Sequence, residues 1–302
     1  MNTIHRTSVA AKRILAPWAY ILARAFSSEK WGRLAKQLDP ENLRASSFVG
    51  LKGHSIQHIR QFQKAALLST KATPEAAERI KRLFSISESQ LLQDIFCAIT
   101  LDEKRLGFFV EVGVGSGRDI SNTYMLEKHF GWKGVLVEPN RSSHASILGC
   151  RDAFLERRAG ASTSGQKLSF LEMIDAGEHS RVVGTGGHYL PEARTAEYEV
   201  ETITLTEILD GMGAPSTIDF LSLDTEGSEI DVLSGLDLSR YCFKIMVIEH
   251  NYDRLVQAKL DSILLPMGYV NVFPDISEFD AWYVHKDVVS AGFPMLRDYG
   301  EL

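Results

Sequence analysis

Three glycines at alternating positions, Gly113, Gly115 and Gly117, follow the apolar run FFVEV in this chain of 302 residues. Glycine allows the positive φ angles of a sharp turn, and its lack of a Cβ lets a ligand approach the backbone closely. A carboxylate, Glu138, ends the next apolar run, 21 residues beyond Gly117. At that depth a carboxylate can accept hydrogen bonds from both hydroxyls of a ribose. Together these features predict a site for a cofactor that contains a nucleoside.

A second group of reactive side chains ends two later apolar runs. Asp224 follows the run from Ile218 to Leu223, and Glu249 and His250 follow the run from Lys244 to Ile248. Asp224 could position a substrate hydroxyl or remove its proton, bind a cationic group of a cofactor, or cap a turn. Glu249 is a further candidate base, and so is His250, which titrates near neutral pH. The three side chains could also hold a divalent ion, but no spacing demands one, and we predict no metal site.

The elements that must position these residues follow from the pattern of apolar runs. From Gly107 onward, short apolar runs bounded by glycine or acidic residues are separated by helical stretches. Nearly continuous apolar runs are typical of parallel strands buried on both faces. Their alternation with helices predicts an α/β fold with a doubly wound sheet and a ligand crevice at the carboxyl ends of the strands. The last two runs lack an intervening helix, which predicts an antiparallel pair. The expected strands cover residues 108–112, 134–137, 153–159, 218–223, 244–248, 269–273 and 281–284.

The first part of the chain has a different texture. Residues 1–100 contain few β-branched runs and predict a helical N-terminal extension to a catalytic domain over residues 101–302. Apolar residues recur every three or four positions over Pro74–Phe84 and Ser87–Ile99, as in amphipathic helices. Thr73 is the expected N-cap of the first of these helices, because a first-turn proline follows it.

Three further features concern the catalytic domain. The segment from Ile120 to Phe130, after the glycine loop, predicts a helix. The segment from Gln166 to Tyr198 contains a cluster of glycines and predicts a mobile loop over the substrate side. Trp132 and Trp282 lie within or beside strands, a placement more typical of core residues than of substrate platforms.

Composition disfavours several classes of function. With 44% hydrophobic and 24% charged residues, the chain is typical of a soluble globular protein with a sizeable core. A formal net charge of −6 gives no general attraction to phosphate backbones, so we expect no nucleic-acid partner. The three cysteines are far apart in the sequence and odd in number, which fits a reducing, cytoplasmic location.

The N-terminal segment, residues 1–28, carries five basic groups and no acid around the apolar run from Ile14 to Ala23. That run is about half as long as a bilayer span requires, and Pro17 interrupts it. We expect the segment to pack on its own protein. Weak contact with a membrane surface and a targeting role are the alternatives.

Several separated blocks, in the same order, resemble one known family. The segment GFFVEVGVGSGRDISNTYMLEKHFGWKGVLVEPN, the later IDFLSLDTEGSEIDVLSGLDL, and the short VIEHN and DAWYV are similar to the FkbM-type methyltransferases. The loop form EVGVGSG, with Glu111 two residues before the first glycine, is typical of methyltransferases. The preceding SESQLLQDIF resembles the helix that leads into that domain, so the resemblance covers about Ser87 to His285.

The resemblance implies a Rossmann-like class I methyltransferase fold, with a mostly parallel sheet of seven strands and an antiparallel last strand. It also implies S-adenosylmethionine as the methyl donor and, usually, a hydroxyl acceptor on a sugar, glycan or natural-product small molecule. By position, Glu111 and the three glycines would surround the methionine and ribose of the donor, and Glu138 would bind the ribose. Asn122, in the family's SNT block, would bind the methionine carboxylate or belong to a helix cap. Asp224 would lie next to the transferred methyl group.

Two other functions stay open. A nicotinamide-dependent oxidoreductase could use a similar fold, but its fingerprint has a third glycine where this chain has Arg118. A non-catalytic Rossmann-like binding protein would keep the fold without the chemistry. The intact glycine loop, Glu138 and Asp224 speak against such a decayed site.

Overall fold

The computed structural model describes residues 61, 64–186 and 192–290. By its contacts the chain divides into two compact units, residues 1–86 and 87–302. In the first unit, α5 (Pro74–Phe84) has the predicted bounds, and the Thr73 hydroxyl accepts a hydrogen bond from the Ala76 amide at 3.2 Å. The N-terminal apolar run and the basic groups around it lie outside the described residues.

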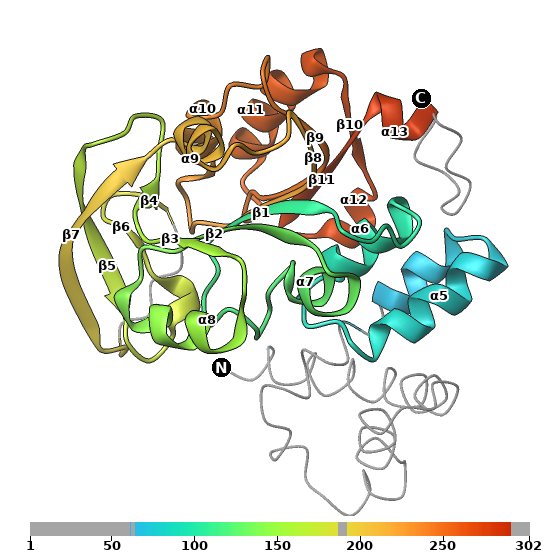
Figure 1. Ribbon diagram of the computed structural model, residues 1–302, viewed down its shortest axis with the longest axis horizontal. Helices are drawn as coiled ribbons and strands as arrows, with labels where there is room; N and C mark the ends of the chain where they lie inside the picture. The colour runs from blue at the N-terminus through green and yellow to red at the C-terminus, as the bar shows by residue number, and fades with distance from the viewer. Residues whose placement is uncertain (1–60, 62–63, 187–191, 291–302) are drawn as a thin grey trace, which may run out of the picture. The chain divides into compact units, whose positions relative to one another are not determined.

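A seven-stranded sheet forms the centre of the second unit and confirms the predicted Rossmann-like fold (Figure 1). Its strand order is β10-β11-β9-β8-β1-β2-β3. All neighbouring strands are parallel except β11, which runs antiparallel to both β9 and β10. The predicted antiparallel pair at the end of the chain is therefore confirmed. The strands are β1 (Phe108–Val112), β2 (Lys133–Val137), β3 (Phe154–Glu156), β8 (Thr217–Leu223), β9 (Cys242–Glu249), β10 (Tyr269–Val272) and β11 (Asp280–His285).

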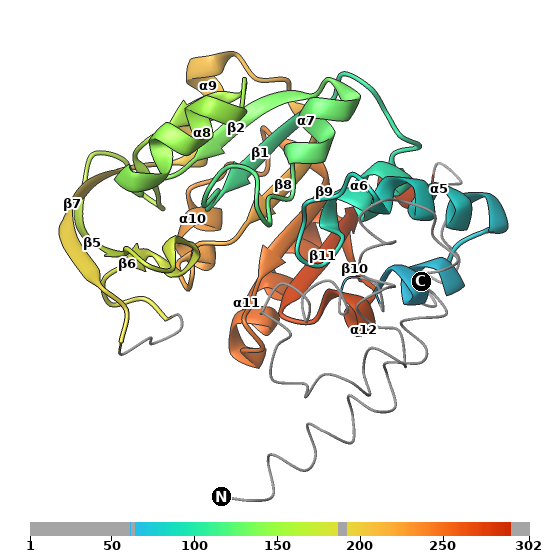
Figure 2. The same ribbon diagram turned by 90° about the horizontal axis from the view of Figure 1, so that it is seen from below.

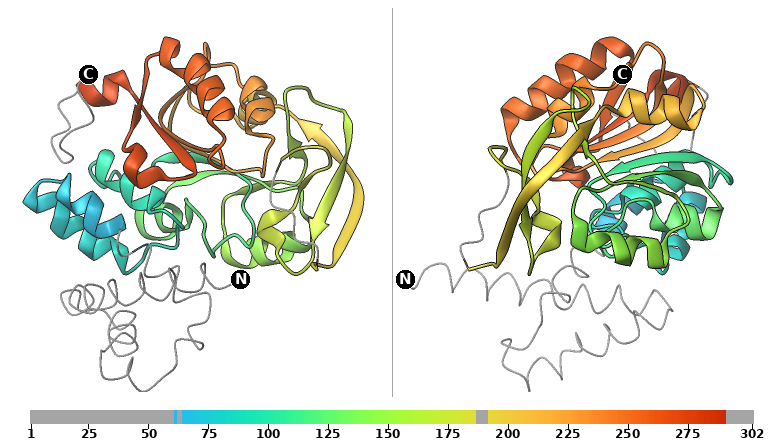
Figure 3. Two further views of the ribbon diagram at one scale, coloured as in Figure 1. Left: turned by 180° about the vertical axis from the view of Figure 1, so that it is seen from behind. Right: turned by 60° about the vertical axis from the view of Figure 1, so that its left-hand side comes forward.

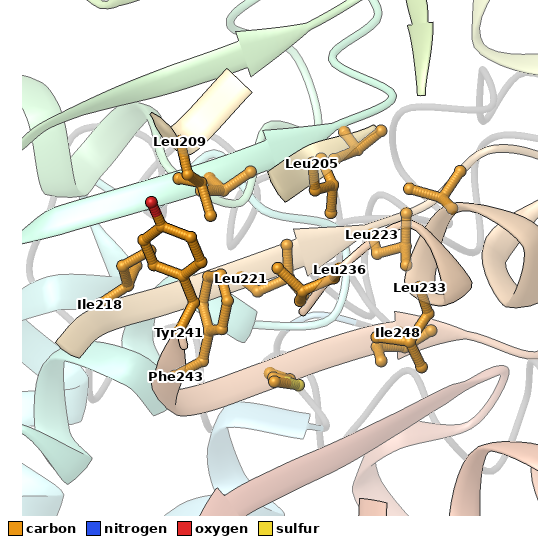
Figure 4. Packing of buried hydrophobic residues seen from close by; sticks show 14 of the residues in the cluster. Leu205, Leu209, Ile218, Leu221, Leu223, Leu233, Leu236, Tyr241, Phe243 and Ile248 are labelled. Carbon is orange, nitrogen blue, oxygen red and sulfur yellow. The ribbon is translucent and has the colours of Figure 1, made fainter. Parts of the chain in front are cut away.

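Helices cover both faces of this sheet, which is why its strands are apolar throughout. On one face, α9, α10 and α11 pack against alternate residues of β1, β8 and β9, and Figure 4 shows Leu205 and Leu209 of α9 above Ile218 and Leu221 of β8. On the other face, Phe96 of α6 stacks on Trp282 of β11 with ring centroids 4.5 Å apart. Figure 3 shows α6 and α7 on this second face. The helices are α6 (Gln93–Thr100), α7 (Tyr124–Phe130), α8 (His144–Cys150), α9 (Leu205–Met212), α10 (Glu229–Ser234), α11 (Arg254–Leu264), α12 (Pro274–Ser277) and α13 (Lys286–Ser290), with single turns η2 (Arg141–Ser143), η3 (Gly177–His179) and η4 (Leu265–Met267).

Trp132 and Trp282 belong to the core, as predicted. Trp132 is 3% exposed and Trp282 is fully buried. Among the described helices, none combines the length and the apolar character that crossing a bilayer requires.

A second sheet occupies much of the segment for which a mobile loop was predicted. Its order is β4-β7-β5-β6, and it lies at one end of the main sheet (Figures 1 and 2). The loop prediction is wrong for β5, β6 and the start of β7. The polar residues of β5 and β7 leave no continuous apolar run from which these strands could be recognised in the sequence. The strands are β4 (Ala159–Gly160), β5 (Lys167–Met173), β6 (Arg181–Val182) and β7 (Thr195–Ile203).

Two predicted helices begin later than their apolar pattern indicates. The expected helix at Ser87 begins at Gln93, because the Ser87 and Ser89 hydroxyls donate to the Asp94 carboxylate at 2.8 and 2.5 Å and Leu92 has a φ of 69°. The helix expected from Ile120 begins at Tyr124 for a similar reason. Side chains of its first residues are hydrogen-bonded to the main sheet rather than arranged on a helix, as described below.

Candidate functional site

A cavity that is partly open to solvent lies at the carboxyl ends of β1, β2 and β8. This is the edge at which ligands bind in doubly wound sheets. Its walls include the glycine loop after β1, the segment that leads into α7, and the turn after β8. The second sheet closes the cavity from the other side with Phe170, Arg181 and Val182.

The three glycines of the loop have three different surroundings. A Cβ on Gly113 would lie 1.6 Å from the Asp224 carbonyl oxygen, so glycine here lets the ends of β1 and β8 approach each other. Gly115 has a φ of 56°, and no atom lies within 4 Å of its Cβ position. Gly113 and Gly115 line the cavity. Gly117, predicted to surround the cofactor, instead packs against Ile147 of α8.

Glu138 faces the glycine loop from the end of β2 and lines the same cavity. One carboxylate oxygen accepts hydrogen bonds from the amides of Val114 and Gly115 at 2.9 and 2.8 Å, and the other accepts one from Asn140 at 2.9 Å. Burial raises the pKa of this carboxyl group. Each carboxylate oxygen can accept more than one hydrogen bond, so Glu138 orders the loop and can still bind a ligand hydroxyl.

Glu111 also lines the cavity, but its carboxylate is bound by the protein. It accepts hydrogen bonds from the Ser121 and Thr123 hydroxyls and from the Asn122 amide, the last at 2.8 Å. The fully buried Arg151 guanidinium lies 3.5 Å from it. The predicted cofactor contact of Glu111 therefore competes with a structural role in holding residues 121–123.

Asn122 lines the cavity together with Ile120 and Ser121. Its amide nitrogen donates to the Ser222 hydroxyl at 2.9 Å, whereas its buried Oδ1 has no hydrogen-bond partner within the described part of the chain. The Ser121 hydroxyl accepts a hydrogen bond from the Tyr124 amide at 3.1 Å, so it caps the first turn of α7. Ser121 therefore helps to begin α7. The unpaired Oδ1 of Asn122 is an acceptor and suits a hydrogen-bond donor rather than the methionine carboxylate considered for this block.

Asp224 and Glu249 meet at the ends of β8 and β9, and their carboxyl groups are hydrogen-bonded to each other. Burial and the repulsion between neighbouring carboxylates raise the pKa of both groups. Two buried carboxyl groups in contact cannot both ionise easily, so the pair retains a proton at neutral pH. Asp224 lines the cavity, with Glu249 behind it.

The turn after β8 contributes a further carboxylate, Glu226, which is 6% exposed and lines the cavity. One of its oxygens lies 2.8 Å from Nδ1 of His179 in the η3 turn, and its other oxygen has no partner within the described residues. The carboxylate raises the pKa of His179. The same turn is held by Glu229, which accepts hydrogen bonds from the Thr225 and Gly227 amides.

His250 is not among the residues that line the cavity. Its Nε2–H donates to the Asp280 carbonyl at 3.0 Å, and burial lowers its pKa. The structure thus brings Asp224, Glu226 and Glu249 together, with one carboxylate oxygen of each within 4.8 Å of the others. The three-residue group considered from the sequence had His250 in the place of Glu226.

Comparison with known proteins adds three findings. The model of the methyltransferase FkbM domain matches residues 111–282, which is more than half of the chain. No curated protein sequence matches this chain. A proposed RNA methyltransferase from Pyrococcus horikoshii has 8% identity and a TM-score of 0.34 over 65% of this chain and 83% of its own. A precorrin-6y C5,15-methyltransferase from Geobacter metallireducens has 11% identity and a TM-score of 0.35 over 65% of this chain and 86% of its own.

Proposed function

The chain belongs to the FkbM methyltransferase family, and from that premise we propose that it transfers a methyl group from S-adenosylmethionine to a hydroxyl oxygen of a small molecule. The acceptor class that we propose is a sugar, a glycan or another natural product. The single observation that carries this proposal is one cavity that contains the glycine loop, Glu138, Asn122 and Asp224.

The residues of the cavity fit the donor at its two polar ends. Glu138 and the open face of Gly115 form the part suited to the ribose hydroxyls, because the carboxylate accepts hydrogen bonds and no Cβ fills the space. Asn122 Oδ1 is a buried acceptor without a donor, which is costly unless a ligand supplies one. The ammonium group of the donor is such a hydrogen-bond donor.

S-adenosylmethionine supplies a methyl group already activated on a positively charged sulfur, so the chain must chiefly hold the acceptor in line with it. Of the two neighbouring acids, Asp224 lines the cavity and Glu249 does not. This supports a role for Asp224 in orienting the acceptor hydroxyl and in receiving its proton. The enclosing second sheet supports a small acceptor, because Phe170 and Val182 limit the space beside the turn after β8.

The experiment is a screen of the full-length chain for ligand binding and turnover. We expect S-adenosylmethionine and S-adenosylhomocysteine to raise the melting temperature, nicotinamide cofactors to have no effect, and labelled methyl groups to reach hydroxyl-bearing small molecules in extracts. Stabilisation by a nicotinamide cofactor alone would favour an oxidoreductase. Donor binding without transfer to any acceptor would favour a non-catalytic binding protein.

The cellular location belongs to this proposal as well. All three cysteines are free thiols, which supports a reducing compartment, and we propose the cytoplasm.

A further inference from the structure

We infer that Asp224, Glu226 and Glu249 form a binding site for one divalent cation, of the magnesium or manganese class, at the wall of the cavity. The assigned role of the cation, to hold the acceptor hydroxyl beside the donor, rests on the proposed function. The binding site itself rests on the placement of the three carboxylates.

The backbone brings these carboxylates together from two adjacent strands. Leu223 of β8 pairs with Ile248 of β9 in parallel register, so the residues that follow them, Asp224 and Glu249, leave the sheet side by side. Glu226 returns to the same place through a turn in which its own φ is 57°. One oxygen from each of the three carboxylates lies within 4.8 Å of the others, a spacing that lets a single ion contact all three.

A separate observation points to a missing ligand. Glu226 and Glu249 are 6% and 7% exposed, and the Oε2 atom of each is buried without a hydrogen-bond partner in the described part of the chain. Native proteins rarely leave buried polar atoms unpaired, because the lost hydration is not replaced. Two unpaired carboxylate oxygens beside a third carboxylate are explained if a cation completes the group.

The local charge balance supports the same conclusion. Within the described residues, His179 is the only basic side chain that forms an ion pair with any of the three carboxylates. Glu229 and Asp280 lie near enough to add to the repulsion on Asp224. A divalent cation would offset this excess of negative charge, whereas one imidazolium offsets only part of it.

The ligand atoms indicate the type of ion. Three carboxylates and no thiolate or imidazole form a hard oxygen site, which suits Mg²⁺ or Mn²⁺ better than Zn²⁺. With few protein ligands, such an ion keeps positions open for water or for a substrate oxygen. An acceptor hydroxyl in one of these positions loses its proton more easily.

The chemical step then balances without a further reactant. The hydroxyl oxygen forms a bond to the methyl carbon, and the carbon–sulfur bond breaks with its electron pair remaining on sulfur. Asp224 receives the hydroxyl proton and releases it to solvent. The products are a methyl ether, a neutral thioether and one proton.

The test uses the full-length chain after treatment with chelator and dialysis. Free Mn²⁺ is measured by electron paramagnetic resonance during a titration at neutral pH, and S-adenosylhomocysteine binding is measured separately by calorimetry with and without metal. We expect one Mn²⁺ per chain, and an affinity at least about tenfold lower in Glu226→Gln and Glu249→Gln. The control Glu199→Gln removes an exposed carboxylate from β7 and should bind Mn²⁺ like the wild type.

A structural effect of the substitutions is checked by melting temperature without metal. Removing one of several repelling buried carboxylates should leave the melting temperature unchanged or raise it, and Mn²⁺ should raise it only in the wild type and the control. Absence of Mn²⁺ binding by the wild type, or equal binding by the three glutamine variants, would overturn the inference. If S-adenosylhomocysteine still binds in that case, the metal site is rejected and the proposed function stands. Binding of Mn²⁺ without any donor binding would instead reject the proposed function and keep the metal site.

Discussion

Glu249 and Asp224 share a hydrogen bond across the ends of two adjacent parallel strands. The contact connects the cavity wall, where Asp224 lies, to a carboxyl group buried behind it. Burial and the repulsion between neighbouring carboxylates raise the pKa of both groups, so the pair retains a proton. The expected consequences for activity follow from the place of Asp224 in the cavity wall.

Replacing Asp224 by asparagine should abolish proton acceptance while keeping nearly the same shape. We expect the rate of methyl transfer to fall roughly 100-fold or more, which is the usual scale of general base catalysis. The affinity for S-adenosylhomocysteine should change by less than about threefold, because Glu138 and the glycine loop are untouched. Single-turnover transfer and calorimetry measure the two effects. If Asp224→Asn lost donor affinity but kept its rate at saturating donor, the result would contradict a role at the acceptor. Asp224 would then be assigned to binding the ammonium group of the donor.

Two glycines of the same loop provide a matched pair of alanine substitutions. In Gly113→Ala the new Cβ meets the Asp224 carbonyl at 1.6 Å, and φ is 81°, so we expect a loss of about 2 kcal/mol or more in the free energy of unfolding. In Gly115→Ala no atom lies within 4 Å, and the strain at φ 56° should cost only about 1 kcal/mol.

Donor affinity should depend on the other glycine of the pair, Gly115. The Gly115→Ala methyl group points into open space beside Glu138, so it should weaken donor binding roughly tenfold even where the protein is folded. Urea unfolding and calorimetry distinguish the two variants. Equal stability of both proteins would contradict the packing assigned to Gly113, and normal donor affinity in Gly115→Ala would contradict the position of the donor.

A buried acid away from the cavity predicts a pH dependence of stability. Burial raises the pKa of Asp94 from 3.8 to about 6. Its folded-state pKa lies above the unfolded value, so the contribution to stability is fully present below pH 3.8 and is lost as the pH rises toward 6. The loss amounts to about 3 kcal/mol at most.

Asp94→Asn should remove this part of the pH dependence. We compare the free energy of unfolding in urea at several values between pH 4 and 7 for the wild type and the variant. The wild type should lose stability relative to Asp94→Asn across this range. Parallel curves would mean that Asp94 ionises in the folded protein as it does in the unfolded chain.

The main sheet could be predicted from the sequence because its strands are buried on both faces. In β8, Thr217–Leu223, all residues after the first are buried, and the run is recognisable without any partner. The second sheet could not be predicted in this way. In β7 an exposed residue alternates with a partly buried one until Val200, so its polar sequence resembles a loop. Its strand character depends on pairing with β5.

In the site, too, some features could be predicted from the sequence and others depend on tertiary packing. Glu138 and Asp224 end predicted strands, and parallel strands bring their ends to one edge, so their common location followed from the topology. The contact between Glu226 and His179 joins two different sheets, and no local pattern in the sequence predicts it. His250 was considered for catalysis because it ends β9, but the antiparallel β11 beside it supplies the Asp280 carbonyl that binds its ring. Such a register is fixed only by tertiary packing.

The most direct test of the central claim, that one cavity binds the adenosyl donor between Glu138 and the glycine loop, is a calorimetric titration with S-adenosylhomocysteine. The wild type and the control Glu199→Gln should bind one molecule per chain with equal affinity. Glu138→Gln should bind about tenfold or more weakly, because a hydrogen bond to a charged group contributes about 1.5–3 kcal/mol. Unchanged affinity in a folded Glu138→Gln, or no binding by the wild type, would contradict the account.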